Sequence, residues 1–328
     1  MKAVLLDGFG GPEVLRMGDA DMPSPALGQV LIKVVTTSVN RPDIIQREGH
    51  YPPPRGESEI LGLEVAGTIA EIGPGVDTCQ RGDRVMSLVA GGGYAEYAVA
   101  YASHLIPIPD TMSFEEAACV CETYITAYLN VFMLGGLEDG QAVLLHGGGG
   151  GVNTAAIQLC RVLAPNGRIM VTSSPGKIER VRALGADLVI NYQEEDFAEA
   201  VKVYTGGRGA DVILDHVGAT YLAANMKALA VAGTLMIIGI MGGAKAELNL
   251  ALMMVKRQRI IGSVLRSRPV QEKGEIVTQF TRTVMPALAD RRIVPLIHRT
   301  YALAEVAEAH QTMEASRHFG KIVLKVDQ

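Results

Sequence analysis

The sequence predicts an α/β protein in which a small β-barrel is combined with a doubly wound parallel sheet. Residues 1–110 consist of short apolar runs separated by proline and glycine, which is typical of an irregular barrel. From 140 to 265 strand-like and helix-like segments alternate, which favours a parallel sheet covered by helices. Five consecutive glycines at 147–151 stand between the first such strand and its helix.

The barrel strands are expected at 30–35 and 65–72, where the chain alternates or runs apolar. After Pro109 the pattern changes, because S-F-E-E at 113–116 is a capping-box helix start. Residues 117–134 then contain few turn residues and are expected to form one long helix.

The parallel sheet is expected from four strand–helix units followed by two more strands. The strands are predicted at 142–145, 168–172, 188–190, 211–214, 234–239 and 259–265, and the helices at 152–163, 176–184, 196–204 and 220–230. Beyond them, helices at 275–289 and 303–314 and a strand at 321–326 have no domain-sized core of their own. This tail is expected to return to the barrel.

The composition excludes several classes of protein. Hydrophobic residues make up 48% and charged residues 20% of the chain, which fits a packed soluble protein. A net charge of −5 without a basic tract disfavours a nucleic-acid partner. Four cysteines without C-x-x-C spacing favour a reduced, cytoplasmic location. The uncharged, mostly apolar run 228–244 includes four glycines and is too short for a membrane span.

The glycine run predicts a phosphate-binding turn. Without side chains, the backbone can approach a pyrophosphate, and the N–H groups that open the next helix attract an anion. A merely flexible loop is the alternative, which the surrounding strand and helix disfavour. The expected contacts are Gly148, Gly149, Gly150, Gly151 and Val152.

Several motifs together resemble one family. They include S-V-N-R-P-D at 38–43, I-L-G-L-E-V-A-G at 60–67, G-G-G-Y-A-E-Y at 91–97, H-G-G-G-G-G-V-N at 146–153 and G-K-I-V-L at 320–324. In this order they are similar to the medium-chain dehydrogenase/reductases, and within them to the zinc-independent quinone oxidoreductase (zeta-crystallin-like) branch. The resemblance implies a GroES-like catalytic domain at 1–121 and 265–328 and an inserted Rossmann domain at 122–264.

The segments G-I-M-G-G at 239–243 and V-L-R-S-R at 264–268 resemble the tumour-suppressor-inducible subgroup of that branch. Two positions depart from the family pattern. Asn153 replaces the last glycine of the nucleotide motif, so a looser contact between helix and strand is expected there. Gly150 replaces a small polar residue, so a hydroxyl contact to cofactor or substrate is lost.

The resemblance implies that no metal is bound. Zinc-dependent relatives hold their catalytic zinc with cysteine and histidine, whereas Asn40 and Leu63 stand at the corresponding positions here. Without a Lewis acid, oxidation of an alcohol is disfavoured. A quinone or an enone can accept hydride with help from hydrogen bonds alone.

The end of the second strand of the parallel sheet favours NADPH over NADH. No carboxylate follows the strand until Glu179, so an acid that would bind the adenosine ribose and repel its 2′-phosphate is missing. Ser173, Ser174 and Lys177 can bind that phosphate, and the resemblance adds Tyr192. A solvated helix position is the alternative for Lys177.

Asn40 and Tyr51 are the candidate catalytic residues, because the matching residues of related quinone reductases line the cleft near the nicotinamide. The Tyr51 hydroxyl could stabilise developing charge on a quinone oxygen, or its ring could merely pack beside prolines 52–54. Arg266 could reach a cofactor phosphate or lie at the surface. Further cofactor contacts are expected from Thr126, Gly239, Ile240, Met241, Leu265, Arg266 and Ser267.

Three other residues invite a catalytic interpretation that the sequence does not favour. His146 and His216 have no carboxylate partner at a recognisable offset and are expected to be strand-end residues satisfied by backbone. Glu64 is expected to be a structural carboxylate within the barrel.

The sequence therefore predicts an NADPH-dependent, metal-free reductase of quinones. Two alternatives remain: reduction of an activated C=C bond in an enone or enoyl thioester, and a non-catalytic NADPH-binding or RNA-binding protein. The resemblance also implies a homodimer formed through an edge strand near 234–239 or 259–264.

Overall fold

The computed structural model describes residues 1–326. Its contacts divide the chain into two units. Unit 1 comprises Met1–Ile125 and the chain from Leu265 onward, and unit 2 comprises Thr126–Val264. The sequence places the first boundary after residue 121, and the contacts place it four residues later, inside a helix.

Seven strands of unit 1 form one sheet, in the order β14-β15-β3-β4-β5-β7 with β6 paired to β3. The C-terminal strand β15 lies between β14, to which it runs parallel, and β3, to which it runs antiparallel. The tail therefore returns to the N-terminal strands as expected. The strands of this sheet are β3 (Gln29–Val39), β4 (Glu64–Ile72), β5 (Arg84–Leu88), β6 (Tyr97–Tyr101), β7 (Leu105–Pro107), β14 (Ile297–Ala302) and β15 (Lys321–Lys325), while β1 (Lys2–Leu6) and β2 (Leu15–Asp19) pair in a separate two-stranded sheet.

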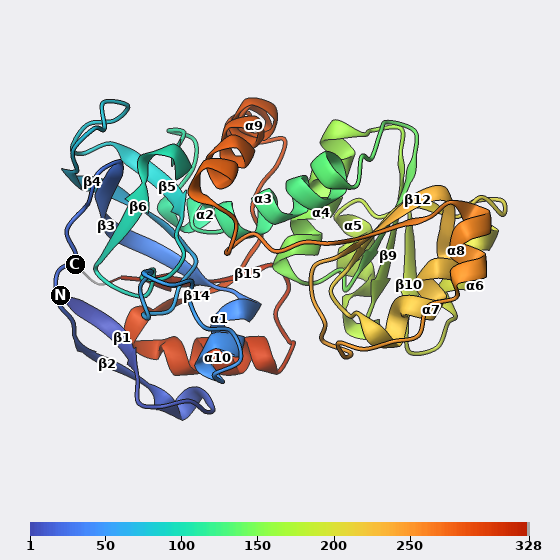
Figure 1. Ribbon diagram of the computed structural model, residues 1–328, viewed down its shortest axis with the longest axis horizontal. Helices are drawn as coiled ribbons and strands as arrows, with labels where there is room; N and C mark the ends of the chain where they lie inside the picture. The colour runs from blue at the N-terminus through green and yellow to red at the C-terminus, as the bar shows by residue number, and fades with distance from the viewer. Residues whose placement is uncertain (327–328) are drawn as a thin grey trace. The chain divides into compact units, whose positions relative to one another are not determined.

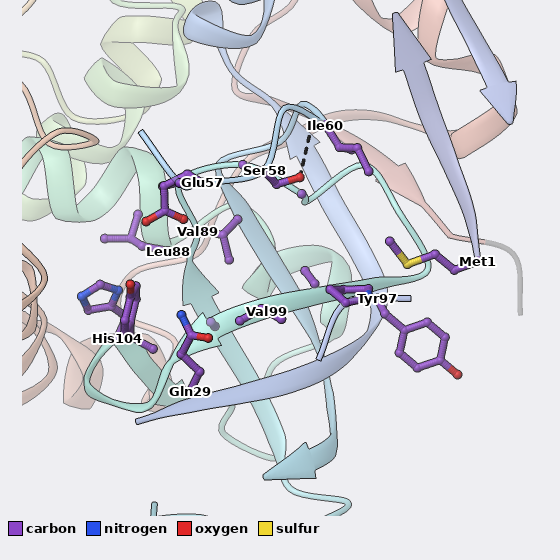
Figure 2. A pocket seen from close by; sticks show the side chains of 18 of the residues that line it. Met1, Gln29, Glu57, Ser58, Ile60, Leu88, Val89, Tyr97, Val99 and His104 are labelled. Carbon is purple, nitrogen blue, oxygen red and sulfur yellow. Dashed lines mark hydrogen bonds between the residues drawn. The ribbon is translucent and has the colours of Figure 1, made fainter. Parts of the chain in front are cut away.

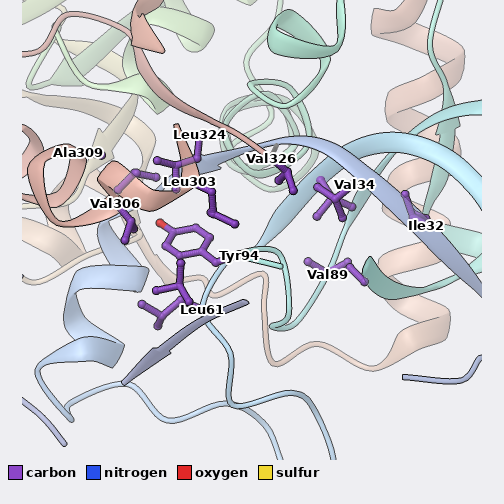
Figure 3. Packing of buried hydrophobic residues seen from close by; sticks show 14 of the residues in the cluster. Ile32, Val34, Leu61, Val89, Tyr94, Leu303, Val306, Ala309, Leu324 and Val326 are labelled. Atoms are coloured by element: carbon purple, nitrogen blue, oxygen red, sulfur yellow. The ribbon is translucent and has the colours of Figure 1, made fainter. Parts of the chain in front are cut away.

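The core of unit 1 is built from both ends of the chain. Figure 3 shows Ile32 and Val34 of β3 in the same cluster as Leu324 of β15 and Val306 of the C-terminal helix α10. Tyr94 lies inside this cluster and is fully buried. Because apolar burial stabilises a fold in proportion to the area removed from water, the two ends of unit 1 depend on each other.

The helices of unit 1 correct one prediction. Residues 117–134 do not form one helix, because Cys119 and Val120 donate their N–H groups to carbonyls three residues back and tighten the chain between α2 and α3. The capping box of Ser113 and Glu116 is present as expected. The helices are α1 (Arg41–Arg47), α2 (Phe114–Ala117), α3 (Cys121–Tyr128), α9 (Val270–Ala289) and α10 (Val306–Glu314).

Unit 2 contains a six-stranded, fully parallel sheet in the order β10-β9-β8-β11-β12-β13. Counted from the first strand of the unit, this order is 3-2-1-4-5-6, which is the Rossmann arrangement. The predicted doubly wound sheet is confirmed. Its strands are β8 (Ala142–His146), β9 (Arg168–Ser173), β10 (Leu188–Asn191), β11 (Ala210–Asp215), β12 (Leu229–Ile237) and β13 (Arg259–Gly262).

Helices cover both faces of this sheet, with α4 on one side and α7 and α8 on the other (Figure 1). β12 begins at Leu229, five residues before the predicted start at 234. The chain bends at Ala232, whose φ is +61°, and the strand continues on both sides of this bend. The helices are α4 (Gly151–Leu163), α5 (Ile178–Ala183), α6 (Phe197–Tyr204), α7 (Ala219–Ala228) and α8 (Leu250–Lys256), preceded by a π-helical turn at Leu129–Leu134. No helix within residues 1–326 is long and apolar enough to cross a bilayer.

The junction between β8 and α4 is tightly packed. A side chain at Gly148 would lie 2.5 Å from a methyl of Val171, which only glycine avoids. Asn153 is buried, and its Nδ2 donates to the carbonyl of His146 and, at 3.1 Å, to that of Gly147. The looser contact expected from Asn153 is therefore wrong, because its amide ties the helix to the end of the strand.

Replacing this amide should destabilise the protein. We expect Asn153→Ala to lower the free energy of unfolding by about 1–3 kcal/mol, since it removes two donors from buried carbonyls. Urea denaturation would measure this loss. Asn166→Ala is the surface control: the Asn166 Nδ2 donates to Asp139 at 2.7 Å on the exposed surface, and the backbone N–H of Asn166, which also donates to Asp139, is kept in the variant. Equal losses in both variants would contradict the role assigned to Asn153.

Candidate functional site

The glycine turn of unit 2 is crossed by a lysine side chain. Gly147 has a φ of +81°, which favours glycine, and a Cβ on Gly149 would lie 2.5 Å from Cδ and 3.1 Å from Nζ of Lys177. Lys177 reaches this turn from the segment that follows β9. Burial, and then the charge of Arg180, lower the pKa of the Lys177 ammonium. The turn therefore brings bare backbone and a cationic side chain together, as a phosphate requires.

The remaining turn residues lead into α4. Gly150 is the N-cap of this helix and has ordinary extended angles, and the atom nearest to a Cβ at this position would be the Gly147 carbonyl oxygen, 3.7 Å away. Gly151 and Val152 form the first turn of α4, where backbone N–H groups lack partners within the helix. The space at Gly150 explains why a small polar residue fits there in the family pattern.

The ends of β9 and β10 lie side by side at the same edge of the sheet. Ser173 pairs in register with Asn191, so Ser174 and Tyr192 follow neighbouring strand ends. Ser173 is buried and its hydroxyl donates to the Ser174 carbonyl, whereas Tyr192 is 42% exposed. The structure therefore brings the predicted phosphate-binding residues of unit 2 to one edge, next to the glycine turn after β8.

The other predicted contacts of unit 2 also follow strand or helix ends. Gly239, Ile240 and Met241 come directly after β12, and the Met241 N–H donates to the His216 carbonyl at 3.1 Å. The side chains of Ile240 and Met241 are largely exposed. Thr126 opens unit 2 within α3. Leu265, Arg266 and Ser267 belong to unit 1.

In unit 1, the carboxylate of Asp43 joins three loops. It accepts hydrogen bonds from the Asn40 N–H at 2.7 Å, the Gly62 N–H at 3.2 Å and the Tyr94 hydroxyl at 3.0 Å. These residues come from the segments 38–43, 60–67 and 91–97. Burial raises the pKa of Asp43 to about 6 in spite of these donors.

Asn40 lies in a buried cluster of charges. Its Nδ2 donates to Glu64 at 3.0 Å, and its Oδ1 accepts from the ammonium of Lys321 at 2.5 Å. Lys321 also donates to Glu64 at 3.0 Å, and Ser38 does so at 2.6 Å. Glu64 is therefore a structural carboxylate, as expected. Both ends of the Asn40 amide are engaged by these partners.

Glu122 extends this cluster at the start of α3. Its N–H donates to Glu64 at 2.9 Å. Burial, and then the negative charge of Glu64, raise the pKa of the Glu122 carboxyl to about 8, so it is largely neutral at pH 7. The charge of Glu122 also raises the pKa of Tyr51, after burial of the phenol itself. Tyr51 therefore keeps its proton at neutral pH.

Tyr51 is covered by Arg266. The guanidinium lies 5.3 Å from the centre of the ring, and Arg266 Nη1 donates to the Tyr51 carbonyl at 3.4 Å. Arg266 Nε donates to the Ala90 carbonyl at 2.8 Å. The side chain is 6% exposed, so the alternative that Arg266 lies at the surface is wrong.

The residues at the expected metal position do not fit zinc. Asn40 and Glu64 are both held by the ammonium of Lys321, and a second cation among them would be repelled. Leu63 offers no donor. Within residues 1–326, no group of three or more histidine, cysteine, aspartate or glutamate side chains is placed to hold a metal ion.

The two histidines beside glycine turns have structural surroundings. His146 is fully buried, and its ring nitrogens bond to Thr172 at 3.1 Å and to Asn225 at 2.7 Å. Its partners are thus side chains rather than the expected backbone groups. His216 packs against Gly147, where a Cβ would lie 2.8 Å from its ring.

Sequence reasoning missed the roles of Lys321, Glu122 and Tyr94. Lys321 lies 257 positions from Glu64, so no local spacing could pair them. The role of Tyr94 could have been predicted from the motif G-G-G-Y-A-E-Y, because a buried tyrosine next to a strand needs a hydrogen-bond partner for its hydroxyl.

The comparisons with known proteins agree with this architecture. The alcohol dehydrogenase GroES-like domain model matches residues 26–110, and the zinc-binding dehydrogenase model matches 184–324. Quinone oxidoreductase from Rattus norvegicus is 32% identical over 327 residues, covering 99% of this chain and 97% of the relative.

Two solved structures are similar over nearly the whole chain. A mycobacterial protein complexed with NADPH has a TM-score of 0.88 at 32% identity, covering 99% of this chain and 100% of that one. Escherichia coli quinone oxidoreductase complexed with NADPH has a TM-score of 0.89 at 26% identity, covering 99% of each chain. With the glycine turn, these matches show an oxidoreductase that uses a nicotinamide cofactor. The chain belongs to the zinc-independent quinone oxidoreductase (zeta-crystallin-like) family of medium-chain dehydrogenase/reductases.

Proposed function

We propose that this protein is an NADPH-dependent quinone reductase that works without a metal. The single observation that carries the proposal is the position of Lys177 over Gly149 at a strand edge without a carboxylate. When bound, the reduced nicotinamide supplies a hydride. The protein's own residues bind the cofactor phosphates, orient the acceptor and supply hydrogen bonds.

The choice of NADPH rests on the edge formed by β9 and β10. The adenosine 2′-phosphate carries negative charge that Lys177 would neutralise, and Ser173, Ser174 and Tyr192 offer hydroxyl donors beside it. The first carboxylate after β9, Glu179, is exposed and paired with Arg182. It is therefore not available in the position where an NAD-specific acid would act.

Tyr51 is proposed to donate a hydrogen bond to the acceptor oxygen. Its pKa is raised by burial, so the phenol is protonated and can stabilise the oxyanion that forms as hydride arrives. Asn40 is proposed to act through position rather than contact, because its amide is already shared between Glu64 and Lys321.

We also propose a homodimer. β13 is an edge strand of the parallel sheet, with β12 as its only neighbour in that sheet within the described chain. Unpaired strand edges are sites of association with a second copy. Exposed apolar side chains also lie on α8, which precedes β13 in the chain, and just after β13, namely Leu250, Met254, Val255 and Val264.

The cofactor proposal predicts a selective effect at Lys177. Lys177→Met should raise KM for NADPH about 10- to 100-fold through loss of a charge-assisted contact, with a much smaller effect on NADH. Initial rates with each cofactor would measure it. Lys202→Met is the control, because Lys202 lies on the exposed face of α6 and pairs with Glu199. An equal change for both cofactors would contradict the assignment.

Tyr51→Phe should lower kcat/KM for a quinone about 10-fold while KM for NADPH stays near the wild-type value, because only the hydroxyl is removed. NADPH oxidation should be followed with an ortho-quinone, a para-quinone and an enone. Turnover of the enone alone would assign the protein to C=C reduction. No turnover with any of the three would refute the enzyme proposal.

Light scattering after gel filtration should give twice the 34.9 kDa mass of the chain. Pairing through β13 satisfies backbone groups that otherwise face solvent. A monomer over the whole accessible concentration range would show that the edge is not used.

A further inference from the structure

The buried basic side chains of unit 1 differ in how their charge is balanced. Within residues 1–326, the lysine and arginine side chains that are more than nine-tenths buried are Arg47, Lys321, Arg266 and Lys273. Arg47 pairs with Glu314, and Lys321 pairs with Glu64 at 3.0 Å. These two follow the usual rule that a buried charge is paired.

Arg266 and Lys273 do not follow this rule. Neither forms an ion pair with a carboxylate in the part of the chain that the structure describes. Arg266 donates only to the backbone carbonyls of Ala90 and Tyr51 there, and its Nη2 is buried without a partner. The Lys273 ammonium donates to the carbonyl of Arg266 at 3.2 Å. Two buried cations are thus neighbours, and their acceptors among these residues are neutral carbonyls.

The surroundings raise the positive potential further. Lys273 lies in the first turns of the 20-residue helix α9, whose N-terminal end carries partial positive charge. Burial lowers the pKa of both Lys273 and Arg266, although the charges of Glu57 and Glu122 raise both. An anion next to the Lys273 ammonium would be attracted by the end of the helix and by both side chains.

A pocket of about 350 Å³ opens next to this pair, and all its lining residues belong to unit 1. Lys273 lines the pocket, and Arg266 lies behind the part of the wall that Ala90 forms. Figure 2 shows Glu57 and His104 toward one end of the pocket, with Met1 and Tyr97 toward the other. The His104 Nε2 donates to the Val270 carbonyl at 3.0 Å, and an imidazole cannot serve as a counter-ion for a cation.

Glu57 is the carboxylate that acts most strongly on Lys273, followed by Glu122, whereas Asp43 and then Glu122 act more strongly than Glu57 on Arg266. The charge of Glu57 raises the pKa of Lys273 and of Arg266, but it forms no ion pair with either within residues 1–326. It is half-buried, on the proline-rich segment that follows Tyr51. Asp21, the other acid of the pocket, is exposed.

We propose that Lys273 and Arg266 form a binding site for a carboxylate or sulfonate group carried by the electron acceptor. This inference rests on the proposed reductase function, because the guanidinium of Arg266 also covers the ring of Tyr51. Lys273 would contact the oxyanion through the pocket, and Arg266 would stabilise it from behind. The preferred acceptors are thus small, electron-poor molecules that bear one anionic group. A free organic carboxylate would have the same chemistry and is distinguished by the test below.

The test compares para-naphthoquinone with its sulfonate in wild type and in Lys273→Met. The variant should lower the ratio of kcat/KM for the sulfonate over the neutral quinone about 10-fold or more, because a charged hydrogen-bond partner is lost. Because the two acceptors have the same reduction potentials with both proteins, comparing this ratio between wild type and variant cancels their difference. Arg268→Met is the control, since Arg268 is ion-paired with Glu272 nearby. An unchanged ratio in Lys273→Met excludes the acceptor as the source of the anion.

A second arm requires no turnover and separates this inference from the proposed function. Benzoate should raise the melting temperature of wild type and Arg268→Met, but not of Lys273→Met, and benzamide should raise none of them. A benzoate shift without a change in the ratio assigns the site to a free carboxylate. If neither benzoate nor the ratio responds to Lys273→Met, the proposal is overturned, whether or not quinones are reduced.

Glu57→Gln tests the competing idea that Glu57 is the counter-ion. We expect this variant to bind benzoate more tightly, since a like charge is removed from the pocket. A lower melting temperature with no gain in benzoate binding would assign the counter-ion role to Glu57 and overturn the proposal. Lys273→Met itself should fold, because it removes a buried charge and keeps most of the side-chain volume.

Discussion

The ion pair between Lys321 and Glu64 is the interaction on which unit 1 depends. Both side chains are almost completely buried, and a charge of this kind is tolerated only when its partner is in place. Lys321 lies on β15 and Glu64 opens β4, so the pair bridges strands from opposite ends of the chain. Asn40, Ser38 and the start of α3 are oriented by the same carboxylate.

Much of the fold could be predicted because its signals are local. The parallel sheet of unit 2 follows from strand-and-helix alternation, and the glycine turn follows from five adjacent residues. The tight turn at Cys119 and Val120 could not be predicted, since no proline or glycine marks it. Asn153 was misjudged because a side-chain amide here takes over the close contact that glycine usually provides.

In the candidate site, too, the features with local sequence signals could be predicted and the long-range partners could not. Lys177 and the glycine turn could be found from two consecutive strand–helix units, and the structure brings them together. Asn40 could be named, but its partners could not, because Lys321 comes from the other end of the sequence. Whether Arg266 was buried could not be predicted either, since its acceptors, Ala90 and Tyr51, lie far away in the chain.

The place of β15 also has a consequence for biosynthesis. This strand is not at the rim of its sheet but between β14 and β3, so among the described strands of this sheet an interior one is the last to leave the ribosome. Unit 2 has all its strands before β15 is made and can fold as it emerges. Until β15 arrives, β3 keeps an open hydrogen-bonding edge and Glu64 has no counter-ion. The half-made barrel is therefore the stage of synthesis at which chaperones have an exposed strand to protect.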